Sequence, residues 1–341
     1  MSRIRRLIAA VAMLALLVTG CSGTPSPTVV PSSANILFTP TLGLTYIPNV
    51  QFAPFYVAEA EGAFAEHQVA ATLRHHGAQE GLFTALAAGQ EQYVIAAGDE
   101  LVQARSQGMD LVGIAQYYQR YPVVIIVPED SPVQSAADLR GKKVGVPGRY
   151  GASWFALQAA LADAGMTESD IEVVEIQYTA QVALPTGRVD AVVGFSNNDS
   201  VQFALSDILT RDVPLTSDGE VPLVSVVLVT THEHLRAQPA EAAAVAKAMV
   251  AGIERTVKNP DLALTASARH IPGGLADEKA KESAQATLEA TIPLWTNADG
   301  EVSGDLDPEA WKAMTDFMLD KGLIASPVDP AEAMTNQVIA G

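Results

Sequence analysis

The chain has 341 residues, of which 48% are hydrophobic and 18% charged, a composition typical of a folded globule rather than a disordered chain. Its formal net charge of −18 argues against nucleic acid or anionic lipid as a partner. About 300 residues remain beyond the N-terminal segment, more than one hydrophobic core usually holds. The sequence therefore predicts two lobes.

The N-terminal segment predicts export and anchoring. Arginines among the first six residues precede the apolar run 7–18, which is too short to span a membrane as a folded helix, so residues 1–20 are expected to be a signal peptide. The run ends in Val-Thr-Gly-Cys, which resembles the lipobox of bacterial lipoproteins and implies that Cys21 is acylated. Cys21 is the only cysteine, so an intramolecular disulfide is excluded. Residues 21–38, rich in serine and proline, predict a flexible tether at the extracytoplasmic face of the cell membrane.

The remainder alternates β-branched strands with alanine-rich helices. The first series predicts strand 42–47, helix 54–64, strand 69–74, helix 80–88, strand 93–96, helix 99–107 and strand 111–116. The second series predicts strands 123–127 and 143–146, helix 152–164, strands 171–176 and 189–193, helix 199–205 and strand 223–229. Helices 240–257, 277–290 and 308–320 complete the chain. Alternation at this spacing predicts parallel sheets with crossover helices, and hence an α/β fold.

Several segments resemble the solute-binding proteins grouped with sulfonate binders and with thiamine-pyrimidine binders and synthases. The segments are Leu44–Asn49 with Pro54–Ala58, Glu61–Phe64, Asp138–Gly145 and Gly187–Ala191. The resemblance implies a type II periplasmic-binding-protein fold, with two α/β lobes around a ligand cleft joined by two crossover strands. The first lobe is then expected over 39–122 and 223–341 and the second over 123–222, with hinges near 121–127 and 222–229.

The same resemblance implies a substrate-binding lipoprotein that delivers a heterocycle to an ABC permease and its ATPase. Binders of thiamine pyrimidine precursors usually have tryptophan, histidine and glycine where this chain has Tyr46, Phe52 and Pro54. The segments Pro48–Tyr56, Tyr121–Val124, Gly151–Ser153 and Asn197–Gln202 look more like riboflavin-binding lipoproteins of ABC importers. Riboflavin is therefore favoured as the ligand, with a pyrimidine precursor as the alternative.

Ligands of open α/β sheets bind beyond the carboxyl ends of the strands, where aromatic rings stack on a heterocycle and amides read its edge. The candidate binding residues are Tyr46, Asn49, Gln51, Phe52, Gly98, Asp99, Tyr117, Gln119, Tyr121, Tyr150, Gly151, Ser153, Trp154, Phe195, Asn197 and Asn198. Two purely structural interpretations stay open. Asp99 could simply cap a helix, and the tyrosines of segment 117–121 could be packing residues.

Catalytic motifs are not expected. The sequence has no G-x-S-x-G elbow. The pairs His75–His76 and His232–His234 have no plausible third metal ligand nearby and are expected at the surface. The resembling family includes a pyrimidine synthase that uses pyridoxal phosphate, iron and a cysteine-rich motif. With Cys21 as its only cysteine, this chain lacks that motif, so the sequence predicts a binding protein without cofactor or metal.

Overall fold

The computed structural model describes residues 35–339, except for 78, 79, 218, 220 and 274. The predicted signal peptide, Cys21 and the tether up to residue 34 lie outside the described residues. The described residues belong to one compact unit that begins at Asn35. Leu37 and Phe38 already donate backbone hydrogen bonds to the Gln68 carbonyl, at 2.9 and 3.1 Å, so the folded body begins before residue 39.

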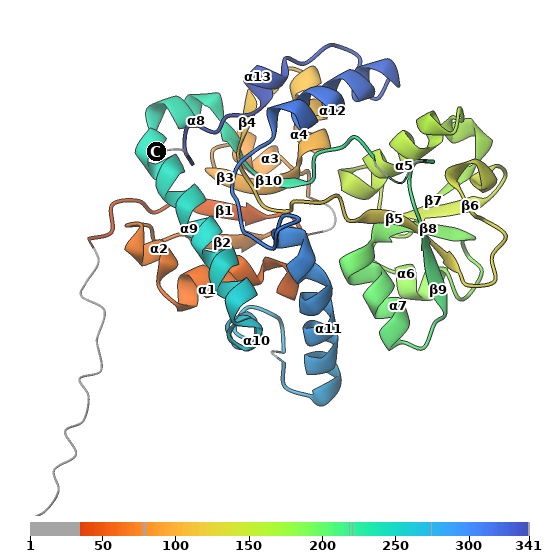
Figure 1. Ribbon diagram of the computed structural model, residues 1–341, viewed down its shortest axis with the longest axis horizontal. Coiled ribbons are helices and arrows are strands. Elements are labelled where there is room, and N and C mark those ends of the chain that lie inside the picture. The colour runs from red at the N-terminus through yellow and green to blue at the C-terminus, as the bar shows by residue number, and fades with distance from the viewer. Residues whose placement is uncertain (1–34, 78–79, 218, 220, 274, 340–341) are drawn as a thin grey trace, which may run out of the picture. The chain divides into compact units, whose positions relative to one another are not determined.

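The first lobe is built on a five-stranded sheet with the order β2-β1-β3-β10-β4 (Figure 1). Its strands are β1 (Thr41–Leu44), β2 (Thr72–His75), β3 (Tyr93–Ala97), β4 (Leu111–Gln116) and β10 (Val226–Thr231). Strand β1 pairs in parallel with β2 and β3, whereas β10 lies antiparallel between β3 and β4. A strand from late in the chain therefore occupies an inner position of the first sheet.

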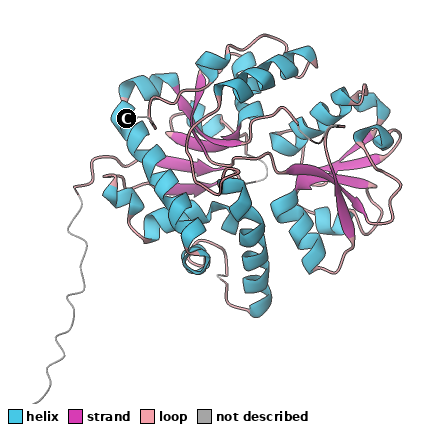
Figure 2. Cartoon of the chain, in the orientation of Figure 1, coloured by secondary structure: helices cyan, strands magenta, loops and turns pink. Residues whose placement is uncertain are grey.

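The second lobe has its own five-stranded sheet, with the order β7-β6-β8-β5-β9. Its strands are β5 (Val123–Pro128), β6 (Lys143–Val146), β7 (Glu172–Glu175), β8 (Ala191–Phe195) and β9 (Thr210–Val213). Strand β6 is parallel to β7 and β8, and β5 is antiparallel to β8 and β9. Both sheets are covered by helices on both faces (Figure 2), which explains why their inner strands are apolar runs such as Val-Val-Ile-Ile-Val in β5.

The helices divide between the lobes as follows. In the first lobe they are α1 (Ala53–Ala60), α2 (Ala63–Glu66), α3 (Thr84–Ala87), α4 (Gly98–Ser106), α8 (His232–Ala237), α9 (Pro239–Lys258), α10 (Pro260–Ser267), α11 (Glu278–Trp295), α12 (Pro308–Asp320) and α13 (Pro330–Ala333). In the second lobe they are α5 (Gly151–Asp163), α6 (Ala180–Ala183) and α7 (Val201–Leu205). Short 3₁₀ turns η1 (Val50–Phe52), η2 (Ala136–Leu139) and η3 (Glu168–Asp170) and the π-helix η4 (Ser196–Ser200) complete the structure. No helix within the described part of the chain is long and apolar enough to cross a membrane.

Alternating side chains of β3 supply the two cores of the first lobe. Tyr93 and Ile95 belong to the core formed with α1 and α9, whereas Val94 and Ala96 belong to the core formed with α4 and α12. The second core includes Trp311, which is fully buried. A Cβ atom at Gly113 of β4 would lie only 3.1 Å from the Trp311 ring, so the glycine lets the indole pack directly on the strand.

The chain crosses between the lobes twice, which confirms the two-lobed fold class expected from the sequence. It leaves the first sheet through residues 117–122, between β4 and β5, and returns between β9 and β10. The hinges expected at 121–127 and 222–229 overlap strands β5 and β10, because both apolar runs are mostly paired inside the sheets. The crossing segments lie just before these strands.

Candidate functional site

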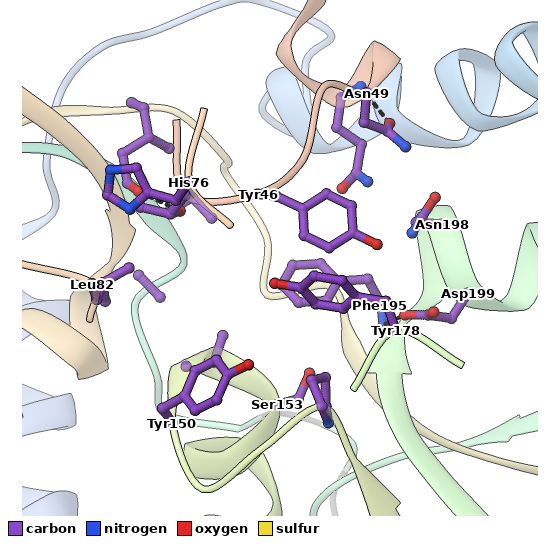
Figure 3. Close-up of a pocket in the computed structure, with 18 of the residues that line it drawn as sticks. Tyr46, Asn49, His76, Leu82, Tyr150, Ser153, Tyr178, Phe195, Asn198 and Asp199 are labelled. Carbon is purple, nitrogen blue, oxygen red and sulfur yellow. Dashed lines mark hydrogen bonds between the residues drawn. The ribbon is translucent and has the colours of Figure 1, made fainter. Parts of the chain in front are cut away.

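A cavity of about 370 Å³ lies between the lobes, within the size range of small-molecule sites. Its walls come from segments that follow strands of both sheets, with Tyr46 and Asn49 from the first lobe and Tyr178 and Phe195 from the second (Figure 3). The cavity is thus formed where ligands of α/β sheets are expected.

The first-lobe wall begins where β1 ends. The Asn49 side-chain oxygen accepts a hydrogen bond from the Gln51 backbone N–H at 3.0 Å and so caps η1. Pro54 follows in the first turn of α1, a position where a proline costs no hydrogen bond. These local features hold Tyr46, Asn49 and Phe52 against the cavity.

Tyr46 meets the opposite wall directly. Its ring lies edge-on to Tyr178 of the second lobe, with the centroids 4.7 Å apart and an interplanar angle of 73° (Figure 3). Tyr178 follows β7 in the chain. One aromatic residue from each lobe therefore contacts the other across the cavity.

The tyrosines of the first crossing segment have different surroundings. Tyr117 and Tyr118 are buried and line the cavity, and Tyr117 also stacks on Phe55 at 5.3 Å. Tyr121 lies outside the lining, because its hydroxyl donates a hydrogen bond to Asp99 Oδ2 at 2.5 Å. Gln119 also lies outside, since its amide donates to the Ser303 carbonyl at 2.7 Å.

The second-lobe wall contains the loop between β6 and α5. A Cβ atom at Gly148 would lie 2.2 Å from the Tyr150 ring, so only glycine lets that ring fold back over the loop. Gly151 begins α5 with a positive φ of 77°. Tyr150, Gly151 and Ser153 line the cavity. Trp154 lies outside the lining, with the Arg149 guanidinium 5.1 Å from its ring centroid.

The π-helix η4 supplies the remaining polar wall, and π-helical turns are frequent at functional sites. The Asp199 carboxylate folds back and accepts a hydrogen bond from the Phe195 N–H at 2.8 Å. A Cβ atom at Gly194 would lie 2.6 Å from that carboxylate, so this turn requires a glycine. Burial raises the pKa of Asp199 to about 6.

Asn197 lies next to the cavity but outside its lining, because its side chain connects the lobes. Its amide donates to the Thr291 hydroxyl of α11 at 2.9 Å and lies 3.4 Å from Gln51 Oε1. Asn198, its neighbour, lines the cavity. The two asparagines therefore have separate roles in the structure, one between the lobes and one facing the cavity.

Asp99 and Glu100 form a buried carboxyl pair at the start of α4. The Glu100 N–H donates to Asp99 Oδ1 at 2.6 Å, and Glu100 Oε2 accepts from the Ala97 N–H at 2.7 Å. Burial raises the pKa of Asp99 to about 7. Burial and the charge of Asp99 raise the pKa of Glu100 to about 8. Glu100 lines the cavity, whereas Gly98 and Asp99 do not, since Asp99 turns toward Tyr121 and Val224 packs against Gly98.

The histidines expected at the surface are in fact largely covered. His76 is only 3% exposed and lines the cavity (Figure 3), with Nε2 hydrogen-bonded to Glu91 at 2.9 Å. His75 packs against Tyr46 and Tyr56, and His234 bonds to Glu241 at 2.9 Å. The sequence pattern misplaced His75 and His76 because their partners Tyr46 and Glu91 lie 29 and 15 residues away in the chain. Among the described residues, no group of three or more His, Cys, Asp or Glu side chains could hold a metal ion.

The cavity includes most, but not all, of the residues expected from the sequence. Those that line it are Tyr46, Asn49, Gln51, Phe52, Tyr117, Tyr150, Gly151, Ser153, Phe195 and Asn198. Those outside its lining are Gly98, Asp99, Gln119, Tyr121, Trp154 and Asn197. Lining residues that the sequence reasoning missed include Thr45, His76, Glu80, Glu100, Tyr118, Gln177, Tyr178, Gln181, Asp199 and Gln202. Gln177 and Tyr178 directly follow a predicted strand, so the rule that selected the other candidates could also have selected them.

Two α/β lobes with a cavity between them define the class of periplasmic-binding-protein folds. Residues 49–263 match the model of the family described as NMT1/THI5 like, and the chain belongs to this family.

Individual relatives agree with this assignment. The chain is 30% identical to the riboflavin-binding protein RibY of Chloroflexus aurantiacus, over 96% of each chain. It is 23% identical to the formylaminopyrimidine-binding protein of Halalkalibacterium halodurans, over 86% of this chain and 88% of that protein. Among solved structures, it resembles the alkanesulfonate-binding protein SsuA of Xanthomonas axonopodis pv. citri with a TM-score of 0.67. The sequence identity to SsuA is 18%, over 87% of this chain and 98% of that one, so this likeness concerns the fold.

Proposed function

We propose that this chain is the lipid-anchored solute-binding subunit of an ABC importer and that it captures riboflavin outside the cytoplasmic membrane. The aromatic lining of the cavity carries this proposal. The rings are Tyr46, Phe52, Tyr117, Tyr118, Tyr150, Tyr178 and Phe195. A planar heterocycle gains from stacking on such rings, by about 0.5–1.5 kcal/mol per ring beyond the burial of its area.

The polar lining suits the edge of the same kind of ligand. Amide side chains reach the cavity from both lobes, namely Asn49, Gln51, Gln177, Gln181, Asn198 and Gln202. Amides offer donors and acceptors side by side, as the carbonyl and imide groups of a flavin ring require. The similarity to RibY over nearly the whole chain favours a flavin as that heterocycle.

Ligand binding is expected to favour closure of the lobes. A ring held between Tyr46 and Tyr178 contacts both lobes, so the closed state gains interactions that the open state lacks. Because the two rings are 4.7 Å apart, a ligand between them must replace their mutual contact. The closed, loaded protein then docks on the permease, and the lipid on Cys21 keeps it near the membrane.

Riboflavin fluorescence tests the proposal directly. The protein comprising residues 22–341, which includes the whole compact unit, is titrated with riboflavin, and saturable quenching is expected from stacking on tyrosine rings. Tyr46→Phe serves as a matched control for Tyr46→Ala, because it keeps the ring and removes only the hydroxyl. Absence of saturable quenching in the unmodified protein would sink the flavin proposal.

A thiamine pyrimidine precursor is the second candidate, favoured by the similarity to the formylaminopyrimidine-binding protein. Such a ligand has one small ring and fills less of a 370 Å³ cavity than a flavin does. Isothermal titration with formylaminopyrimidine and with riboflavin separates the two. Tighter binding of the pyrimidine would reverse the order proposed here.

A further inference from the structure

The lining of the cavity has more acidic side chains than basic ones. Glu80, Glu100 and Asp199 line it, and the described lining residues include neither lysine nor arginine. Two basic residues beside these walls are already paired with carboxylates of the chain. Arg74 bonds to Glu80 and Glu91, both at 2.6 Å, and Arg149 pairs with Glu168 while lying over Trp154. A bound anion would therefore have no lysine or arginine opposite it, and the lining imidazole of His76 is already bonded through Nε2 to Glu91 at 2.9 Å.

Helix N-termini are the other usual partners of anions, because their first N–H groups are free. At three turns that border this cavity, a backbone N–H at or beside the start of the turn is already bonded to a side chain of the chain itself. Glu100 accepts from the Ala97 N–H at the start of α4, and Asp199 accepts from the Phe195 N–H before η4. Asn49 does the same for η1.

Glu100 also serves the start of α5 in the opposite lobe. A Cβ atom at Gly151 would lie 3.4 Å from Glu100 Oε1, and a hydrogen bond from the Ala152 backbone N–H opposes the rise in the pKa of Glu100. A carboxyl group of the first lobe thus occupies the position where the N-terminus of α5 would attract an anionic ligand.

We propose that the cavity selects uncharged solutes and that Glu100 is the specificity-determining residue that excludes phosphorylated and sulfonated ones. The exclusion of anions is independent of the ligand's identity. Only its application to flavins, which admits riboflavin and rejects riboflavin 5′-phosphate, rests on the function proposed above.

The state of ionisation of Glu100 sets how strong this discrimination is. Burial and the neighbouring Asp99 raise the pKa of Glu100 to about 8, and Tyr121 shares the same carboxyl cluster. Near neutral pH the Glu100 carboxyl is therefore mostly protonated, and an anion meets an occupied helix N-terminus without a full opposing charge, whereas above the raised pKa it meets a full negative charge. Two like charges roughly 7 Å apart at an effective dielectric constant of about 20 weaken binding by about fiftyfold.

The first experiment compares three flavins by fluorescence titration of the protein comprising residues 22–341, at about pH 9 and at about pH 6. These are riboflavin, a neutral 5′-ester and the 5′-phosphate. The ester controls for the added bulk at the 5′ end of the flavin's side chain. The phosphate is expected to bind about tenfold to hundredfold more weakly than the ester at the higher pH, with a smaller ratio at the lower pH. Equal affinities of ester and phosphate at pH 9 would overturn the proposal.

Variants assign the effect to Glu100. Glu100→Gln keeps an oxygen that can accept from the Ala97 N–H and removes the charge, so it should shrink the ester-to-phosphate ratio by about tenfold. Glu241→Gln removes another buried carboxyl, one bonded to Tyr93 and His234 outside the cavity lining, and should leave the ratio unchanged. An unchanged ratio in Glu100→Gln would overturn the role of Glu100.

A test without flavins separates the exclusion of anions from the proposed binding of riboflavin. Sodium sulfate and sodium methanesulfonate are added to the unmodified protein at constant ionic strength, and thermal unfolding is recorded. Sulfate stabilises folded proteins in general, without saturation, because it is excluded from their surface. Neither anion is expected to add a saturable rise in the unfolding temperature, and saturable stabilisation by either would refute the exclusion of anions. If no flavin binds and neither anion stabilises saturably, the flavin assignment fails while the selection against anions stands.

Discussion

Replacing Asp99 by asparagine is expected to stabilise this protein at alkaline pH and to leave its stability in acid nearly unchanged. Asp99 is fully buried. An asparagine fits the same contacts, because its oxygen can accept from the Glu100 N–H and its amide can donate to the Tyr121 hydroxyl. That hydroxyl can then donate to the Ala152 carbonyl, from which it is 3.3 Å away.

The sign and size of the effect follow from the raised pKa. Burial raises the pKa of Asp99 to about 7, whereas an exposed aspartate has a pKa of about 3.9 in the unfolded chain. The stabilising contribution of the neutral carboxyl is complete below the unfolded value and is lost as the pH rises through about 7. At about 1.4 kcal/mol per pKa unit, Asp99→Asn should gain ~2–4 kcal/mol above pH 8. That corresponds to about 4–8 °C in the unfolding temperature.

The assay is calorimetric unfolding between about pH 5 and about pH 9, for the unmodified protein, Asp99→Asn and the control Asp261→Asn. The control changes an exposed aspartate in the first turn of α10. The unfolding temperatures of the unmodified protein and the control should fall together toward pH 9, while that of Asp99→Asn falls less. Parallel curves for all three proteins, or a less stable Asp99→Asn at pH 9, would refute the reasoning.

Four further outcomes are expected. Alanine at Tyr46 or Tyr178 should weaken riboflavin binding by about tenfold in fluorescence titrations, and unchanged affinity would remove that ring from the site. Asn197→Ala loses a 2.9 Å hydrogen bond between the lobes and should weaken affinity severalfold in calorimetric titrations, with equal affinity as the contrary result. Trp311→Ala should lower the free energy of unfolding in urea by ~3–5 kcal/mol, and a loss below about 1 kcal/mol would contradict its role in the core. Cys21→Ser should move the protein from the membrane fraction to the soluble fraction, which immunoblotting of fractionated cells can check.

The apolar strands could be predicted from the sequence because a strand buried on both faces is a continuous run of apolar residues. The strands expected at 93–96, 111–116 and 143–146 agree with β3, β4 and β6 to within a residue. Strand β9 was missed, since its sequence Thr-Arg-Asp-Val has a single buried residue and pairs only with β5 at a sheet edge. The helix expected over 54–64 is two helices, because Gly62 has a φ of 77° and interrupts it.

Only those parts of the site that follow from the local sequence, such as residues directly after strands, could be predicted. Residues after strands were expected to face the cleft, and Tyr46, Phe195 and Asn198 line the cavity. The same rule could not separate Asp99 from Glu100, since both lie in the first turn of α4 and the choice depends on Tyr121. Contacts between residues far apart in the chain decide such cases.

The inner position of β10 has a consequence for the order in which the chain can fold. Strand β4 has only β10 as a neighbour in its sheet, and β10 is made more than a hundred residues later. All strands of the second lobe lie between them, within one continuous stretch. A chain that emerges from its N-terminus can therefore complete the second sheet first, while β4 is still an unpaired edge. During synthesis or export, the first lobe is the part that depends on late residues and the part most in need of protection from aggregation.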